Sequence, residues 1–160
     1  MLKYRVLSQE ELLALETEFK QFLILNELHD AEWRQLASNN PEKAQGFIDL
    51  FSNIVLEKAY QKVPGLLQIG KDFLCVFHLE NETWKLYQFT TKDPLLLQDI
   101  HLDNFNQMLL KHTSAFELYI GSKESSSQKA TTVHELICKG AVILQREILQ
   151  DFLQHFGSIQ

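Results

Sequence analysis

The segment "TTVHELICKGA", residues 131–141, comes closest in its residue types to a catalytic or metal-binding motif. It contains a histidine, a glutamate and a cysteine at His134, Glu135 and Cys138. If the segment is helical, His134 and Cys138 share one face and could both bind one zinc ion. Glu135 would then be the residue that activates a metal-bound water, as the glutamate does in the related H-E-x-x-H motif.

A catalytic zinc site needs a third protein ligand, and no spacing in the sequence indicates one. His155 would lie about 32 Å from His134 along a continuous helix, at about 1.5 Å per residue. It could reach the same ion only if the helix breaks, for instance at Gly140. The remaining candidates are distributed without a pattern; they are His78, His101 and His112.

Each residue of this trio also has a purely structural explanation. Thr132 and Glu135 have the spacing of a capping box, in which Glu135 would close a helix start. In a helix that begins earlier, near Ser127, Glu135 would instead form an ion pair with Lys139. Cys138 lies near an apolar stripe and could pack there as a small hydrophobic residue.

Thiol chemistry elsewhere in the chain is also poorly supported. Cys75 and His78 are three residues apart in a predicted strand and therefore point to opposite faces, so a Cys–His pair would have to form across the fold, for example between Cys75 and His134. No G-x-S-x-G, C-x-x-C or phosphate-binding glycine loop is found. We therefore predict no catalytic residue, cofactor or metal ligand. The alternative hypothesis is a small metal- or thiol-dependent enzyme that uses His134, Glu135 and Cys138.

The elements that must position these residues begin with helices. Ser8 and Glu11 form a capping box, which predicts a helix that runs to about Glu27. Two further helices are expected at residues 31–37 and 41–62, and the apolar residues of the last recur with helical spacing.

The middle of the chain changes to the period of β-structure. "DFLCVFHLENETWKLYQFT", residues 72–90, predicts a hairpin of two strands. Further strands are expected at 65–70 and 116–120. Residues 121–129 carry no apolar side chain, and we expect a mobile loop within the domain there.

The apolar residues from Val133 to Phe152 recur every three or four positions, which predicts one long final helix that ends near Phe156. The predicted fold is therefore a single α+β domain over residues 1–160. It consists of N-terminal helices, a central antiparallel sheet with a β-hairpin, and a long C-terminal helix packed on the sheet.

Composition and charge restrict the possible partners and location. The net charge of −6 and the lack of a basic cluster argue against nucleic acid as a partner. No apolar run is long enough to cross a membrane, and no signal peptide is recognisable. We expect a cytoplasmic protein whose two cysteines, Cys75 and Cys138, remain free thiols.

The leading functional hypothesis is a non-catalytic interaction or regulatory module that binds a protein partner or a second copy of itself. It depends on the acidic charge, the aromatic-rich helices and the lack of an assembled catalytic set. Trp33 and Trp84 are the candidate partner-surface residues, because tryptophan is enriched at interaction hot spots. A pocket for an apolar ligand between sheet and helices is a third possibility.

The stretches "KYRVLSQEELLALETEFKQFLILNELHDAEW" and "NPEKAQGFIDLFSNIVLEKAYQKV" carry a resemblance to known proteins. Over about the first 63 residues the chain resembles a family of uncharacterised bacterial proteins of similar length, a domain of unknown function. The resemblance implies a free-standing protein of the bacterial cytosol. It assigns no role to any residue.

Overall fold

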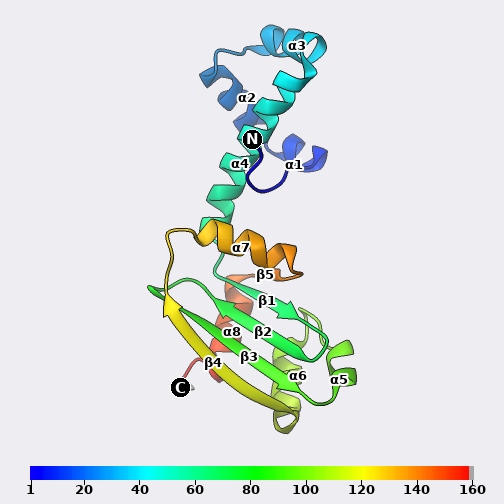
Figure 1. Cartoon of the computed structure of the whole chain (residues 1–160), viewed down its shortest axis with the longest axis vertical. Helices are drawn as coiled ribbons and strands as arrows, with labels where there is room; N and C mark the ends of the chain where they lie inside the picture. Colours follow the sequence, from blue (N-terminus) through cyan, green and yellow to red (C-terminus); the bar gives the residue numbers. More distant parts are fainter. Residues whose placement is uncertain (159–160) are drawn as a thin grey trace. The chain divides into compact units, whose positions relative to one another are not determined.

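The chain is an α+β protein in two compact units. The computed structural model describes residues 1–158, which contain eight α-helices and one five-stranded antiparallel sheet (Figure 1). The first unit comprises Met1–Ala59, and the second begins at Tyr60. The predicted α+β class is confirmed. No helix within residues 1–158 combines the length and apolarity needed to cross a membrane.

The first unit is built from helices. They are α1 (Gln9–Ala14), α2 (Glu16–Leu25), α3 (Asp30–Asn39) and α4 (Pro41–Gln61), the last of which ends in the second unit. The single helix predicted from Ser8 to Glu27 is wrong in one respect, because the chain leaves helical geometry at Leu15 (φ −108°, ψ 24°) and starts again at Glu16. The helix that starts at Pro41 is confirmed.

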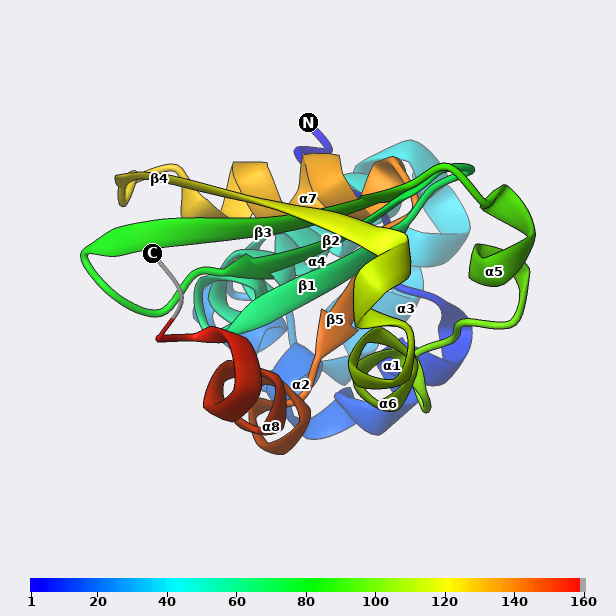
Figure 2. The ribbon, with the colours of Figure 1, turned by 90° about the horizontal axis from the view of Figure 1, so that it is seen from below.

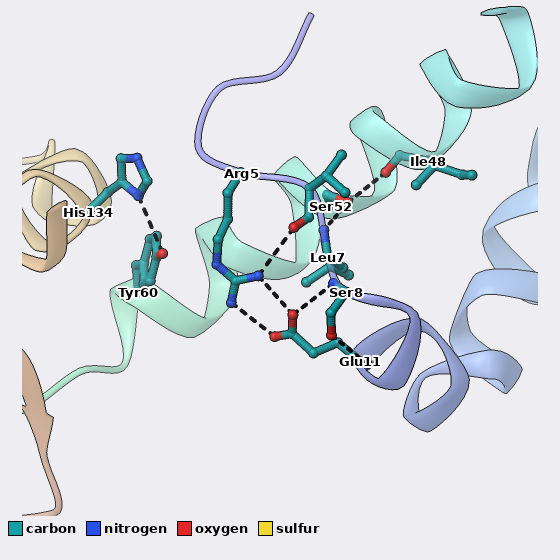
Figure 3. Close-up of polar contacts among 9 residues, drawn as sticks. Arg5, Leu7, Ser8, Glu11, Ile48, Ser52, Tyr60 and His134 are labelled. Carbon is teal, nitrogen blue, oxygen red and sulfur yellow. Dashed lines mark hydrogen bonds and ion pairs between the residues drawn. The ribbon is translucent and has the colours of Figure 1, made fainter.

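The capping box predicted for the first helix is present (Figure 3). The Ser8 hydroxyl accepts a hydrogen bond from the Glu11 backbone N–H, and the Glu11 carboxylate accepts one from the Ser8 N–H. Arg5 donates to both carboxylate oxygens of Glu11, at 2.8 and 2.9 Å. These hydrogen bonds, led by the one from Arg5, lower the pKa of Glu11 to about 2.

The interior of the first unit is an aromatic cluster. Phe19 lies 5.5 Å from Trp33 and 5.0 Å from Phe51, ring centroid to centroid, and Phe22 lies 5.4 Å from Phe51. Trp33 meets Phe19 edge to face, a favourable arrangement for two aromatic rings. These contacts join α2, α3 and α4.

The second unit contains the sheet. Its strands are β1 (Gly65–Ile69), β2 (Phe73–His78), β3 (Thr83–Thr91), β4 (Phe116–Glu124) and β5 (Val142–Leu144). They pair antiparallel in the order β4-β3-β2-β1-β5. The predicted hairpin is confirmed as β2 and β3, with Val76 opposite Tyr87.

Helices cover both faces of this sheet, as Figure 2 shows. On one face lie α5 (Pro94–Gln98), α6 (Phe105–Lys111) and α8 (Arg146–Phe156), and on the other lies α7 (Lys129–Cys138). The main core is on the first face, where Phe152 of α8 is fully buried against Tyr87 and Phe89 of β3 and Phe105 of α6. Sheet and helices thus enclose one apolar layer.

The predicted long C-terminal helix is wrong, because the last helix, α8, has 11 residues. The chain from Lys129 to Phe156 forms α7, then β5, then α8. Gly140 ends α7 with a φ of +98°, a conformation that residues with a side chain rarely adopt. The N–H of Ala141 donates to the Leu136 carbonyl and the N–H of Gly140 to the Ile137 carbonyl, which is the Schellman motif. The chain then adds β5 to the free side of β1.

The segment 121–129, expected to be a loop, is partly a strand. β4 continues to Glu124, where Glu124 pairs with Thr83 of β3, and α7 begins at Lys129. The additional strand residues extend the edge of the sheet beyond the predicted strand at 116–120.

Candidate functional site

His134 and Cys138 lie side by side on α7, as the helical spacing predicted. The Nδ1 atom of His134 is 3.4 Å from the Tyr60 hydroxyl, a contact drawn in Figure 3. Its Nε2 atom is 3.5 Å from the Cys138 thiol. The Tyr60 and His134 rings also pack at 5.8 Å between centroids. The imidazole therefore bridges a hydroxyl and an exposed thiol.

This arrangement lacks a third metal ligand. Within residues 1–158, no three side chains among His, Cys, Asp and Glu converge closely enough to hold a metal ion. Glu135 is exposed, and because α7 already begins at Lys129, Thr132 does not cap the helix with it. His155 lies on α8, across the sheet from α7, so the break in the helix does not bring it to His134.

Cys138 also lacks the surroundings of an activated nucleophile. It is the last residue of α7, whereas nucleophilic cysteines commonly use the positive charge of a helix N-terminus or of neighbouring cations. Cys75 is 6 % exposed in β2, and burial raises the pKa of its thiol to about 11. Cys75 is therefore not presented as a thiolate.

A second candidate site is a groove on the same face of the sheet. It has a volume of about 380 Å³ and lies between α7 and strands β3 and β4. Its lining is mainly apolar and includes Trp84, Leu86, Tyr119, Gly121, Lys123, Thr132 and Leu136. A mainly apolar hollow with a few polar groups is typical of a binding site.

The two tryptophans that were predicted to lie at a partner surface differ in their surroundings. Trp84 is 4 % exposed and lines the groove, and the ammonium of Lys123 lies 5.3 Å from the centre of its ring. Trp33 is half-buried in the aromatic cluster of the first unit. Trp84 thus contacts the candidate groove through a largely covered ring.

The groove lies beside one edge of the sheet, because β4 is the outermost of the described strands on that side. β4 is nine residues long, and side chains on its α7 face alternate with those on its core face. Gly121 and Lys123 on the α7 face border the groove, and Tyr119, two residues before Gly121, is 64 % exposed. Long exposed edge strands are ready templates for pairing with another chain.

Sequence reasoning missed Tyr60, Tyr119 and Lys123. Tyr60 is brought to His134 only by tertiary packing, so no local signal identifies it. Tyr119, Gly121 and Lys123 follow the two-residue period of a strand, and this signal was available in the sequence.

Comparison with known proteins identifies a family. The model of a family of unknown function, DUF6495, matches residues 1–157, well beyond the 63 residues over which the resemblance was first recognised. No curated protein and no solved structure matches the chain.

Proposed function

Since the chain belongs to the DUF6495 family, whose function is unknown, we propose from its geometry that it is a non-catalytic protein-interaction module. The module binds an extended segment of a protein partner along β4, beside the groove that Trp84 lines. The observation that carries this proposal is the nine-residue edge strand bordered by that groove. Main-chain hydrogen bonds along such an edge supply affinity, and pockets for alternate side chains supply specificity.

The chemistry of β4 indicates which segment would fit. Gly121 is covered by the exposed ring of Tyr119 of its own strand, and both residues line the groove, so an aromatic side chain of the partner at this position would contact that ring. Lys123 would pair best with a carboxylate. Since adjacent residues of a strand alternate faces, the partner segment carries an aromatic residue and an acidic residue two positions apart.

The proposal includes a cytoplasmic location. Both cysteines, Cys75 and Cys138, are free thiols, which supports a reducing compartment. Fractionation of the source cells, with detection of the untagged protein, tests this part directly.

A photo-crosslinking residue at the groove tests the interaction. Thr132 lines the groove from α7, and p-benzoylphenylalanine at this position would lie next to a bound segment. The same residue at Gln98, which is exposed on α5 on the other face of the sheet, is the matched control. We expect crosslinks from position 132 alone, to a peptide that contains an aromatic and an acidic residue two positions apart. Absence of crosslinks, or crosslinks to peptides without this pattern, would contradict the proposal.

A second candidate function uses His134 and Cys138, and the 3.5 Å approach of the imidazole to the thiol favours it. In this case the protein is a small metal- or thiol-dependent enzyme, with Glu135 as an additional candidate. Elemental analysis of protein purified without chelators decides the metal version, because stoichiometric zinc or iron that is lost in His134→Ala would support it. A metal-free protein whose melting temperature is unaffected by added zinc would exclude it.

A further inference from the structure

We infer that the segment bound along β4 is β4 of a second copy of this chain, so that two sheets join across a two-fold axis into one. This inference rests on the proposed function, because it names the partner for the same edge and groove. The strand "FELYIGSKE", Phe116–Glu124, has the chemistry that the edge requires of a partner. Glu117 and Tyr119 are an acidic and an aromatic residue two positions apart, and both are exposed.

Antiparallel pairing of the strand with itself has one register that overlaps its full length. The nine residues are centred on Ile120, so a two-fold axis at Ile120 pairs Phe116 with Glu124 of the copy and leaves no strand residue unpaired. In this register Glu117 stands opposite Lys123 of the copy, and Tyr119 stands opposite Gly121. By symmetry each of these pairs occurs twice.

Charge selects the same register. Residues opposite one another in a sheet point to the same face, so the register can change only in steps that keep the faces matched. One step in either direction centres the pairing on Tyr119 or Gly121 and takes Glu117 away from Lys123. The full-length register is therefore the one in which both copies gain an ion pair, and opposite charges across strands stabilise a sheet.

The side chains on the α7 face are placed for this contact. The ammonium of Lys123 is held on that face, over the ring of Trp84. Glu117 lies on the same face and has no ion-pair partner within 4.0 Å among the described residues, and the exposed ring of Tyr119 lies over Gly121 of its own strand. Because each Gly121 is already covered by the Tyr119 ring of its own strand, the two symmetry-related Tyr119 rings would meet each other in the dimer, and the Glu117–Lys123 pairs carry the choice of register.

The opposite edge of the sheet is a weaker candidate. β5 has three residues, Val142–Leu144, and could form few main-chain hydrogen bonds with another strand. Its exposed residues, Val142 and Ile143, carry no charge that would select a register.

A charge exchange tests the register. We expect the wild-type chain to sediment as a dimer and Glu117→Lys to weaken dimerisation roughly tenfold or more, because two attractive pairs become repulsive. The double variant Glu117→Lys with Lys123→Glu restores the opposite charges and should restore the dimer. Glu124→Lys makes the same change of net charge on the same strand but faces Phe116 of the copy, so it is the matched control. All four proteins are compared by sedimentation equilibrium and by circular dichroism, which verifies folding.

The outcomes separate this inference from the proposed function. A dimer that Glu117→Lys weakens, that Glu124→Lys leaves intact, and that the charge exchange restores supports it. A wild-type monomer at all concentrations overturns it, as does equal loss of the dimer in Glu117→Lys and Glu124→Lys. If the wild-type protein is monomeric, crosslinks from position 132 to a different protein would still support the proposed interaction module. Absence of any crosslink would overturn the proposed function as well.

Discussion

The imidazole of His134 lies between two partners, with Nε2 3.5 Å from the thiol of Cys138 and Nδ1 close to the Tyr60 hydroxyl. One turn of α7 separates His134 and Cys138, so their approach follows directly from helix geometry. An exposed thiol next to a histidine is open to chemical modification, whereas the other cysteine of the chain is buried.

The two cysteines should therefore differ in reactivity. At pH 8 we expect iodoacetamide to alkylate Cys138 at least about a hundredfold faster than Cys75, because the thiolate is the reactive form and burial both covers Cys75 and raises its pKa to about 11. Peptide mass spectrometry at timed intervals measures both rates. In urea, where the chain is unfolded, the two rates should become similar, and equal rates in the native protein would contradict the description of Cys75.

Substitution of two glycines should have opposite effects. Gly140→Ala should lower the free energy of unfolding by about 1–2 kcal/mol, because alanine is strained at a φ of +98° even though the space around it is open. Gly46→Ala, inside α4 and also in open space, should raise it by about 0.5–1 kcal/mol. Urea denaturation followed by circular dichroism measures both. If both variants are stabilised, Gly140 does not end α7 as described.

His78 should make stability depend on pH. Burial lowers its pKa below the usual 6.5, and the charges of Lys85 and Lys129 add to this effect, while Glu80 opposes it. The unfolded chain therefore takes up the proton more readily than the folded protein. The contribution of His78 to stability is complete above about pH 6.5 and is lost as the pH falls through 6.5 toward the lower pKa of the folded state.

We accordingly expect the free energy of unfolding to fall between pH 7 and pH 5, and to fall less in His78→Gln. Urea denaturation at a series of pH values gives both slopes. The control is His101→Gln, the same substitution at an exposed position. A slope in His78→Gln as steep as that of the wild type would count against burial of the neutral imidazole.

The core of the second unit should depend strongly on Phe152. This ring is fully buried and lies 5.2 Å from Tyr87 and 4.9 Å from Phe156. Phe152→Ala should cost about 3–5 kcal/mol, because it removes these contacts and leaves a cavity. In a Trp33→Phe background, Trp84 is the remaining tryptophan and its fluorescence follows unfolding of this unit.

The control for this substitution is Leu110→Ala on α6, which is exposed and should change stability by no more than about 0.5 kcal/mol. Similar losses in the two variants would mean that α8 does not pack on the sheet as described.

Features with a local cause were predictable from the sequence. The capping box of Ser8 and Glu11 and the hairpin of β2 and β3 were recognised because their signals lie within a few residues. The proximity of His134 and Cys138 follows from one turn of helix. Each of these depends only on backbone periodicity and nearby hydrogen bonds.

The C-terminal region shows where such reasoning fails. The apolar residues from Val133 to Phe152 keep a helical period across β5, and a short apolar run fits a strand or a helix equally well. These residues form a strand because the edge of β1 is available for pairing. Once Gly140 has ended α7, the backbone N–H and C=O groups of Val142–Leu144 form hydrogen bonds with β1.

The sequence by itself determined the α+β class, most elements and the residues that share a helix face, since these follow from contacts between near neighbours. Only the tertiary structure decided that Tyr60 meets His134, that Trp84 lies under a groove, and that β4 is the edge of the sheet. Those relationships join residues distant in the chain. They arise from the burial of apolar surface over the whole fold, which no local spacing encodes.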